Sequence, residues 1–118
     1  RPYTTFMMRK DTIENEPGFA AAFVRAIYRA QKWVWAAGDE EVAYAMQSYF
    51  PDTDIATLSA VAKSYRATDS WTRVPTMTED AFTRLQDILD GAGELAARIE
   101  LSELVDNSFG EAAISEIG

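Results

Sequence analysis

The segment from about residue 16 to residue 37 constrains the fold most, because it predicts a long helix that is apolar around most of its circumference. Pro17 suits a first helical turn, and Gly38 ends the pattern. An apolar surface this wide predicts burial on more than one side of the helix. The basic side chains form only a narrow stripe, made of Arg25, Arg29 and Lys32. Much of the remaining surface is made of Phe19, Phe23, Val24, Ile27, Tyr28, Val34 and Trp35.

Residues 3–9 precede this helix and are rich in aromatic and β-branched side chains. The segment is too short for a stable helix, so we predict a strand here. No second strand is predicted nearby, and an isolated strand leaves its backbone N–H and C=O groups unpaired. Its partner should therefore lie on another chain or in a part of the protein outside these 118 residues.

Helical spacing of apolar residues continues through the rest of the chain. It predicts further helices over about 40–50, 54–66, 78–91 and 108–117, with a short helical turn over 101–105. Either Thr76 or Thr78 could cap the helix that begins near residue 78. The predicted fold class is mostly α, with one short N-terminal strand followed by four to five helices. Because the loops are short, we expect helices that are consecutive in the chain to pack together.

The charge and the missing residue types exclude several functions. Eleven basic residues face nineteen acidic ones, which gives a net charge of −8 and disfavours binding to a phosphate backbone. The chain has no cysteine and no histidine, so thiolate chemistry is absent, as are the commonest general base and metal ligand. The acidic residues are scattered, and capping explains the two groups at helix starts, Asp39-Glu40-Glu41 and Glu14 to Glu16. We therefore predict no enzyme activity, no metal or other cofactor and no nucleic-acid partner.

A polar loop over about 68–75 holds the two candidate binding residues that the pattern alone singles out, Trp71 and Arg73. A loop Trp can close over a small ligand, or it can anchor the loop to the core. An Arg can bind an anionic group through two hydrogen bonds, or it can lie solvated on the surface. Both alternatives remain open for each residue.

Several short motifs, in order, resemble the C-terminal region of the ABC-transporter solute-binding proteins for nitrate, sulfonates, taurine and thiamine-precursor pyrimidines. The similarity spans essentially the whole chain. Its motifs are Pro2-Tyr3-Thr4, Arg9-Lys10-Asp11, Glu16-Pro17-Gly18-Phe19, Ala22-Phe23-Val24-Arg25-Ala26, Trp33, Tyr49-Phe50-Pro51, Trp71, Thr78-Glu79-Asp80-Ala81-Phe82 and Leu104-Val105-Asp106-Asn107-Ser108-Phe109.

This resemblance implies that residues 1–118 are a single C-terminal fragment of a two-lobed periplasmic-binding-protein fold of the second type. The complete fold is α/β, and the solute binds between its lobes. The resemblance places Tyr3 and Thr4 on a strand that crosses between the lobes, and it adds them to Trp71 and Arg73 as candidate ligand-binding residues. It implies a small-molecule solute and an ABC permease as partners of the complete protein. The implied location is periplasmic or lipid-anchored and extracytoplasmic.

A second function class is an independent helical protein-interaction module that uses the exposed apolar face of the long helix. The sequence also predicts self-association, through either the strand Tyr3–Met8 or the helix Phe19–Trp35, because both lack a covering partner.

Overall fold

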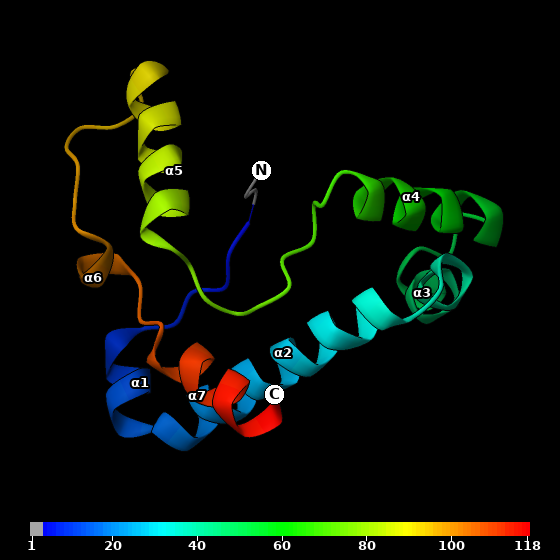
Figure 1. The fold of residues 1–118 in the computed structure, drawn as a ribbon, viewed down its shortest axis with the longest axis horizontal. Helices are drawn as coiled ribbons and strands as arrows, with labels where there is room; N and C mark the ends of the chain where they lie inside the picture. The colour runs from blue at the N-terminus through cyan, green and yellow to red at the C-terminus, as the bar shows by residue number, and fades with distance from the viewer. Residues whose placement is uncertain (1–3) are drawn as a thin grey trace.

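The computed structural model describes residues 4–118, and these residues form helices joined by loops (Figure 1). Within them the predicted mostly α fold is confirmed. The elements are α1 Lys10–Asn15, α2 Pro17–Ala36, α3 Asp39–Met46, the 3₁₀ turn η1 Gln47–Tyr49, α4 Ile55–Ala67, α5 Glu79–Gly91, α6 Leu101–Leu104 and α7 Ser108–Ile117.

The strand predicted over residues 3–9 is wrong for residues 4–9, and Tyr3 lies outside the described residues. Residues 4–118 contain no strand that could pair with this segment. It instead runs as unpaired chain into α1, a helix that the sequence pattern did not predict. The Phe6 ring lies edge-on to Phe23 of α2 with 5.2 Å between centroids, while Met7 is 90% exposed.

The starts of α4 and α5 follow the capping rules. The Thr78 hydroxyl accepts a hydrogen bond from the Ala81 N–H, so Thr78 caps α5. At the start of α4, the Asp54 carboxylate accepts one from the Thr57 N–H at 2.7 Å. Hydrogen bonds from the Thr57 side chain and backbone hold the pKa of Asp54 below its ordinary value of 3.8. The predicted starts at residues 54 and 78 are thus the cap residues themselves.

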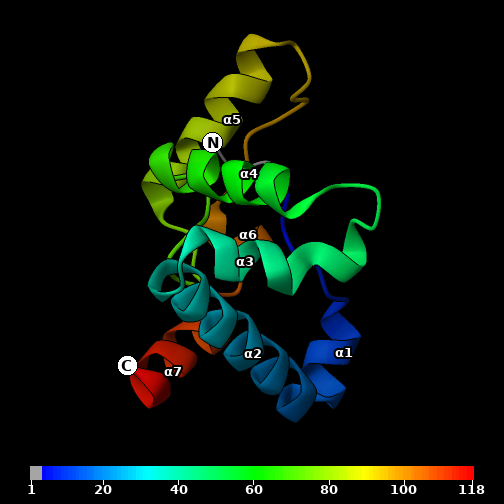
Figure 2. The ribbon, with the colours of Figure 1, turned by 90° about the vertical axis from the view of Figure 1, so that its right-hand side faces the viewer.

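The helices pack only partly in chain order. As expected, α1 packs against α2 and α3 packs against α4. The expectation misses the more extensive contact of α2, which is with α7, a helix distant in sequence (Figure 2). Small residues allow the α2–α7 and α3–α4 contacts, because they let helix axes approach closely. The buried positions are Ala20 and Tyr28 on α2, Gly110 and Ala113 on α7, Val42 and Ala43 on α3, and Leu58 and Ala62 on α4.

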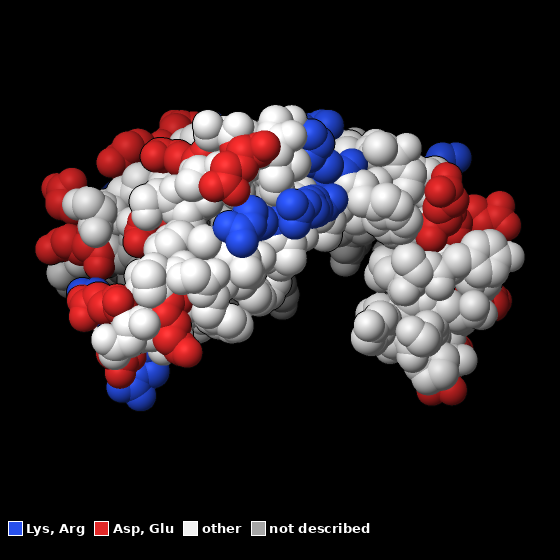
Figure 3. All heavy atoms as spheres, turned by 90° about the horizontal axis from the view of Figure 1, so that it is seen from below, with Lys and Arg blue, Asp and Glu red and all other residues white. Residues whose placement is uncertain are grey.

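The molecule is an open arch. Its radius of gyration is 16.6 Å, whereas a compact chain of this length has about 13.5 Å. Its accessible surface is 8677 Å², about 2,300 Å² more than a compact monomer of this mass exposes. Seen from below, a hollow separates the two ends of the arch, with basic side chains gathered midway and acidic ones toward the ends (Figure 3). The described chain therefore leaves much apolar surface uncovered.

Two carboxamide side chains each form a pair of hydrogen bonds with the backbone N–H and C=O groups of one residue that is distant in sequence. The Gln86 side chain accepts from the Ile99 N–H at 2.9 Å and donates to the Ile99 C=O at 3.2 Å. The Asn107 side chain does the same for Met77, at 2.9 and 2.8 Å. These pairs hold the two long linkers around α5 in place.

We expect Asn107→Asp to lower the free energy of unfolding by about 1 to 3 kcal/mol, because a carboxylate cannot donate to the Met77 carbonyl and would repel it. Urea denaturation followed by circular dichroism measures the change. Gln47→Glu, an amide-to-acid change at an exposed position, is the control and should have little effect. An equal loss in both variants would show that Asn107 does not fix the linker.

Candidate functional site

The linker between α4 and α5 builds a shallow hollow of about 400 Å³ from its own residues. Both Trp71 and Arg73, which the sequence pattern singles out, line it. The remaining lining residues are Asp69, Ser70, Thr72, Thr76 and Thr78, beside Val74, Met77 and Ala81. The structure thus brings two of the four candidate residues to one place.

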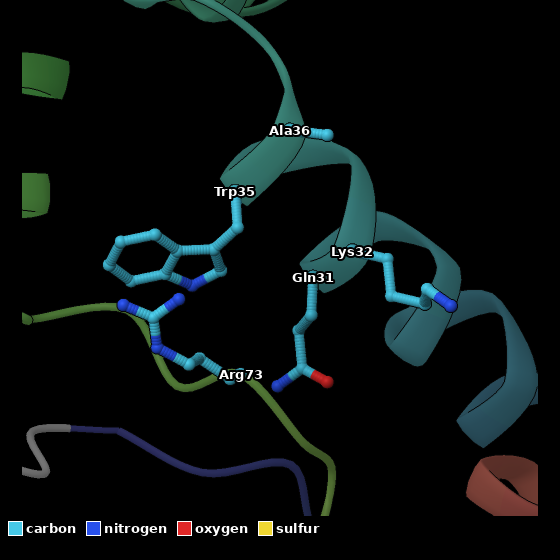
Figure 4. Close-up of a pocket in the computed structure, with 5 residues that line it drawn as sticks. All are labelled: Gln31, Lys32, Trp35, Ala36 and Arg73. Atoms are coloured by element: carbon cyan, nitrogen blue, oxygen red, sulfur yellow. The ribbon is translucent and has the colours of Figure 1, made fainter. Parts of the chain in front are cut away.

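The Arg73 side chain extends from the linker toward the C-terminal end of α2. Its guanidinium carbon lies 3.5 Å from the centroid of the Trp35 ring, a close cation–π contact (Figure 4). The same guanidinium reaches the Asp69 carboxylate at 3.3 Å. Both partners of this ion pair are exposed, so the pair contributes little stability and can exchange with solvent. An incoming anion could therefore replace Asp69 at low cost.

Trp71 points to a different neighbour. Its ring meets Tyr65 of α4 in a T-shaped contact with 5.4 Å between centroids, and the side chain is half-buried. Edge-to-face aromatic pairs of this kind hold loops to helices. Trp71 therefore contacts α4 as an anchor would, while one of its faces still lines the hollow.

The backbone just before Trp71 and Arg73 carries one conformational outlier. Asp69 has a positive φ of 53° at the end of α4, a position that glycine usually fills. The turn is closed by the Ser70 N–H donating to the Tyr65 carbonyl, and by the Asp69 N–H donating to the Arg66 carbonyl. A carboxylate at this costly position keeps a negative charge beside Arg73.

A second hollow, of about 330 Å³, lies on the α2 side of Arg73 and adds residues that sequence reasoning missed. The Gln31 amide donates to the Thr72 hydroxyl at 2.8 Å and so ties α2 to the linker. Two polar atoms of this hollow are buried and have no hydrogen-bond partner among the described residues. They are Oε1 of Gln31 and Nε1 of Trp35. One indication of this second hollow was present in the sequence, because Trp33 and Trp35 point to different sides of one helix. Lining residues of this hollow are Gln31, Lys32, Trp35, Ala36 and Arg73 (Figure 4).

Arg66 fixes the end of α2 that carries Trp35. Its guanidinium donates to the carbonyls of Val34 at 2.8 Å and Ala37 at 3.0 Å, and it pairs with Asp39 at 3.0 Å. It also lies over Trp35, at 5.7 Å from the ring centroid. One α4 side chain therefore caps α2 and holds the start of α3.

These groups form a cationic, half-open site. Arg73 supplies positive charge, and its guanidinium fork matches the oxygens of a carboxylate or sulfonate. The Lys32 side chain points away from Arg73 (Figure 4), and its ammonium donates to the Gly118 carbonyl at 2.6 Å. Among residues 4–118, no cluster of three or more acidic side chains could hold a metal ion. The other two candidates do not join the site: Thr4 is exposed and lines neither hollow, and Tyr3 lies outside the described residues. No helix in the described part of the chain has both the length and the hydrophobicity to cross a membrane.

Comparison with known proteins gives one relative. The chain is 32% identical over 115 residues to a protein of Bacillus subtilis (strain 168) described as "Putative binding protein YtlA". The match covers 98% of this chain and 34% of that protein, so the chain spans about a third of its relative's length. No protein-family model matches the chain. No solved structure matches it.

Proposed function

We propose that this chain is one part of the substrate-binding component of an ABC importer, and that the complete component captures a small organic or anionic solute outside the cytoplasm. The classes of solute are nitrate, sulfonate, taurine and pyrimidine-like molecules. The role is capture and delivery to a permease, without chemical change of the solute.

The observation that carries the proposal is the similarity, over nearly the whole chain, to a protein described as a binding protein. The open arch supports it, because about 2,300 Å² of surplus surface is what a part of a larger fold would expose. The guanidinium of Arg73 favours an anionic solute within these classes. Only a small part of a two-lobed cleft lies in these residues, so the chain alone should bind solute weakly.

The test is a chimera in which this chain replaces the matching segment of the Bacillus subtilis protein. Chimera and parent are screened by thermal unfolding with nitrate, taurine, an alkanesulfonate and an aminopyrimidine. A solute at 100 times its Kd stabilises a binding protein by about 2.7 kcal/mol. We expect the chimera to fold and one solute to stabilise both proteins. A folded chimera that no solute stabilises, beside a parent that responds, would overturn the proposal.

Arg73→Ala in the chimera tests the candidate site. Loss of a charge-assisted hydrogen bond should weaken binding of an anionic solute about 10- to 100-fold in calorimetry. The matched control is Arg84→Ala, which removes another exposed Arg that pairs with an acidic residue four positions away, Asp80 on α5. Unchanged affinity in Arg73→Ala would remove Arg73 from the site.

An independent helical interaction module is the second candidate function. The observation that favours it is the exposed apolar side of α2, where Phe19 is 56% and Trp33 44% exposed. Capture of solute by the chimera would decide against this candidate.

A further inference from the structure

We infer that residues 77–107 form an arm that opens and closes as one unit while the remaining described chain stays folded. The arm contains α5, α6 and the chain between them, and its two ends meet where Asn107 bonds to Met77. Opening of the arm also opens the hollow that Trp71 and Arg73 line. The inference concerns a movement of the fold, so its test needs no solute and does not depend on solute capture.

The base of the arm is closed by two hydrogen bonds, which we call the clasp. The Asn107 side chain accepts from the Met77 N–H at 2.9 Å and donates to the Met77 carbonyl at 2.8 Å, and both bonds are partly buried. Just before the clasp, the chain lies so close to α7 that Gly110 has no room for a Cβ beside the Pro75 carbonyl. The clasp therefore separates a closely packed part of the chain from the arm.

The contacts of the arm are mostly internal. Among residues 4–118, every side-chain hydrogen bond and ion pair that residues 78–105 form joins two residues of that same segment. The Gln86 carboxamide bonds to both backbone groups of Ile99. The Arg98 guanidinium reaches Asp87 at 2.7 Å and Asp90 at 3.2 Å. These contacts tie the chain after α5 back to that helix, and they persist when the arm leaves the rest of the molecule.

The arm has few contacts with its surroundings. Extensive helix packing in the described chain joins α1 with α2, α2 with α7 and α3 with α4, whereas α5 and α6 take no part in it. Figure 1 shows α5 rising away from α2 and α7. Phe82 is the only buried apolar side chain between residues 78 and 105, while Ile88, Ile99 and Leu104 are exposed. A segment with so little buried apolar surface opens at a smaller cost in free energy than the packed core of the same protein.

The arm supplies part of the wall of the linker hollow. Met77, Thr78 and Ala81 line the hollow together with Trp71 and Arg73, which belong to the linker outside the arm. Trp71 contacts α4 and Arg73 contacts α2, so both stay in place when the arm swings out. Opening at the clasp therefore removes one part of the wall and exposes the rest, which makes the clasp a gate of the hollow.

Hydrogen exchange followed by nuclear magnetic resonance, at urea concentrations below the unfolding transition, tests whether the arm opens by itself. The amides of one opening unit share one dependence on urea, which is shallower than that of global unfolding because less surface is exposed. We expect the α5 amides and the Ile99 amide to share such a dependence, with protection about 10-fold or more below that of the central α2 amides. If the α5 amides follow the α2 amides throughout, the arm has no opening of its own and the inference is overturned.

Two variants separate opening of the arm from unfolding of the whole chain. Arg66→Ala removes contacts of α4 with α2 and α3, which persist when the arm alone is open. It should therefore lower the protection of α2 about 10-fold more than that of α5. Asn107→Asp breaks the clasp, which is lost in both openings, so it should lower the protection of both helices about 10-fold. Gln47→Glu is the control and should change neither. An equal loss in both helices from Arg66→Ala, or unchanged α5 protection in Asn107→Asp, would contradict the inference.

Discussion

Gly110→Ala is expected to destabilise the chain by about 1 to 3 kcal/mol, although the same change within a helix normally stabilises it. Gly110 lies in α7, where a side chain would meet the linker between α4 and α5. A Cβ built there would lie 2.4 Å from the Pro75 carbonyl oxygen and 2.7 Å from the Thr76 Cγ2. Because the nearest atom belongs to the backbone, the linker and α7 must move apart. Urea denaturation followed by circular dichroism measures the loss.

Gly18→Ala in α2 is the matched control, because a Cβ at this position meets nothing within 4 Å. It should stabilise the chain by up to about 1 kcal/mol. Both variants are compared at one protein concentration, since self-association would make the apparent stability depend on concentration. Stabilisation by both changes would mean that α7 does not approach the linker as closely as the structure shows.

The contrast between these two glycines shows what the sequence could predict. Local spacing predicted the positions of α2, α3, α4, α5 and α7, because each depends on an amphipathic pattern and a cap within the segment. The packing of α7 on α2 was not predictable in this way. It depends on α7 meeting a helix some eighty residues earlier, and its small buried residues, Gly110 and Ala113, carry no local signal for a distant partner.

The candidate site was likewise predicted only in part from the sequence. The loop position and polar surroundings of Trp71 and Arg73 marked them in the sequence, and the structure places both at one hollow. The contribution of α2 was missed, because Trp35 looks like any other core aromatic in a helical pattern. The predicted strand failed for a related reason. Its residues have strand composition, but pairing needs a second strand that residues 4–118 do not contain.

Arg66→Ala should have the other large effect, a loss of about 2 to 3 kcal/mol in the free energy of unfolding. The Arg66 side chain is only 24% exposed, and it joins three elements by donating to two carbonyls at the end of α2 and to Asp39 of α3. Its removal leaves the α2 carbonyls and a half-buried carboxylate without their donor. Because the guanidinium also lies over Trp35, the near-ultraviolet circular dichroism of that ring should change in the folded variant.

Two further variants separate the effect of the Arg66 hydrogen bonds from a general effect of its charge. Arg66→Lys keeps the charge but offers a point donor in place of a fork, so it should restore only part of the lost stability. Arg84→Ala removes an exposed Arg that pairs with Asp80 within α5, and it should cost about 0.5 kcal/mol or less. Equal stability of Arg66→Lys and the unmodified chain would show that a single ion pair with Asp39 suffices. The end of α2, and with it the orientation of Trp35 toward Arg73, would then be set by packing and not by the hydrogen bonds of Arg66.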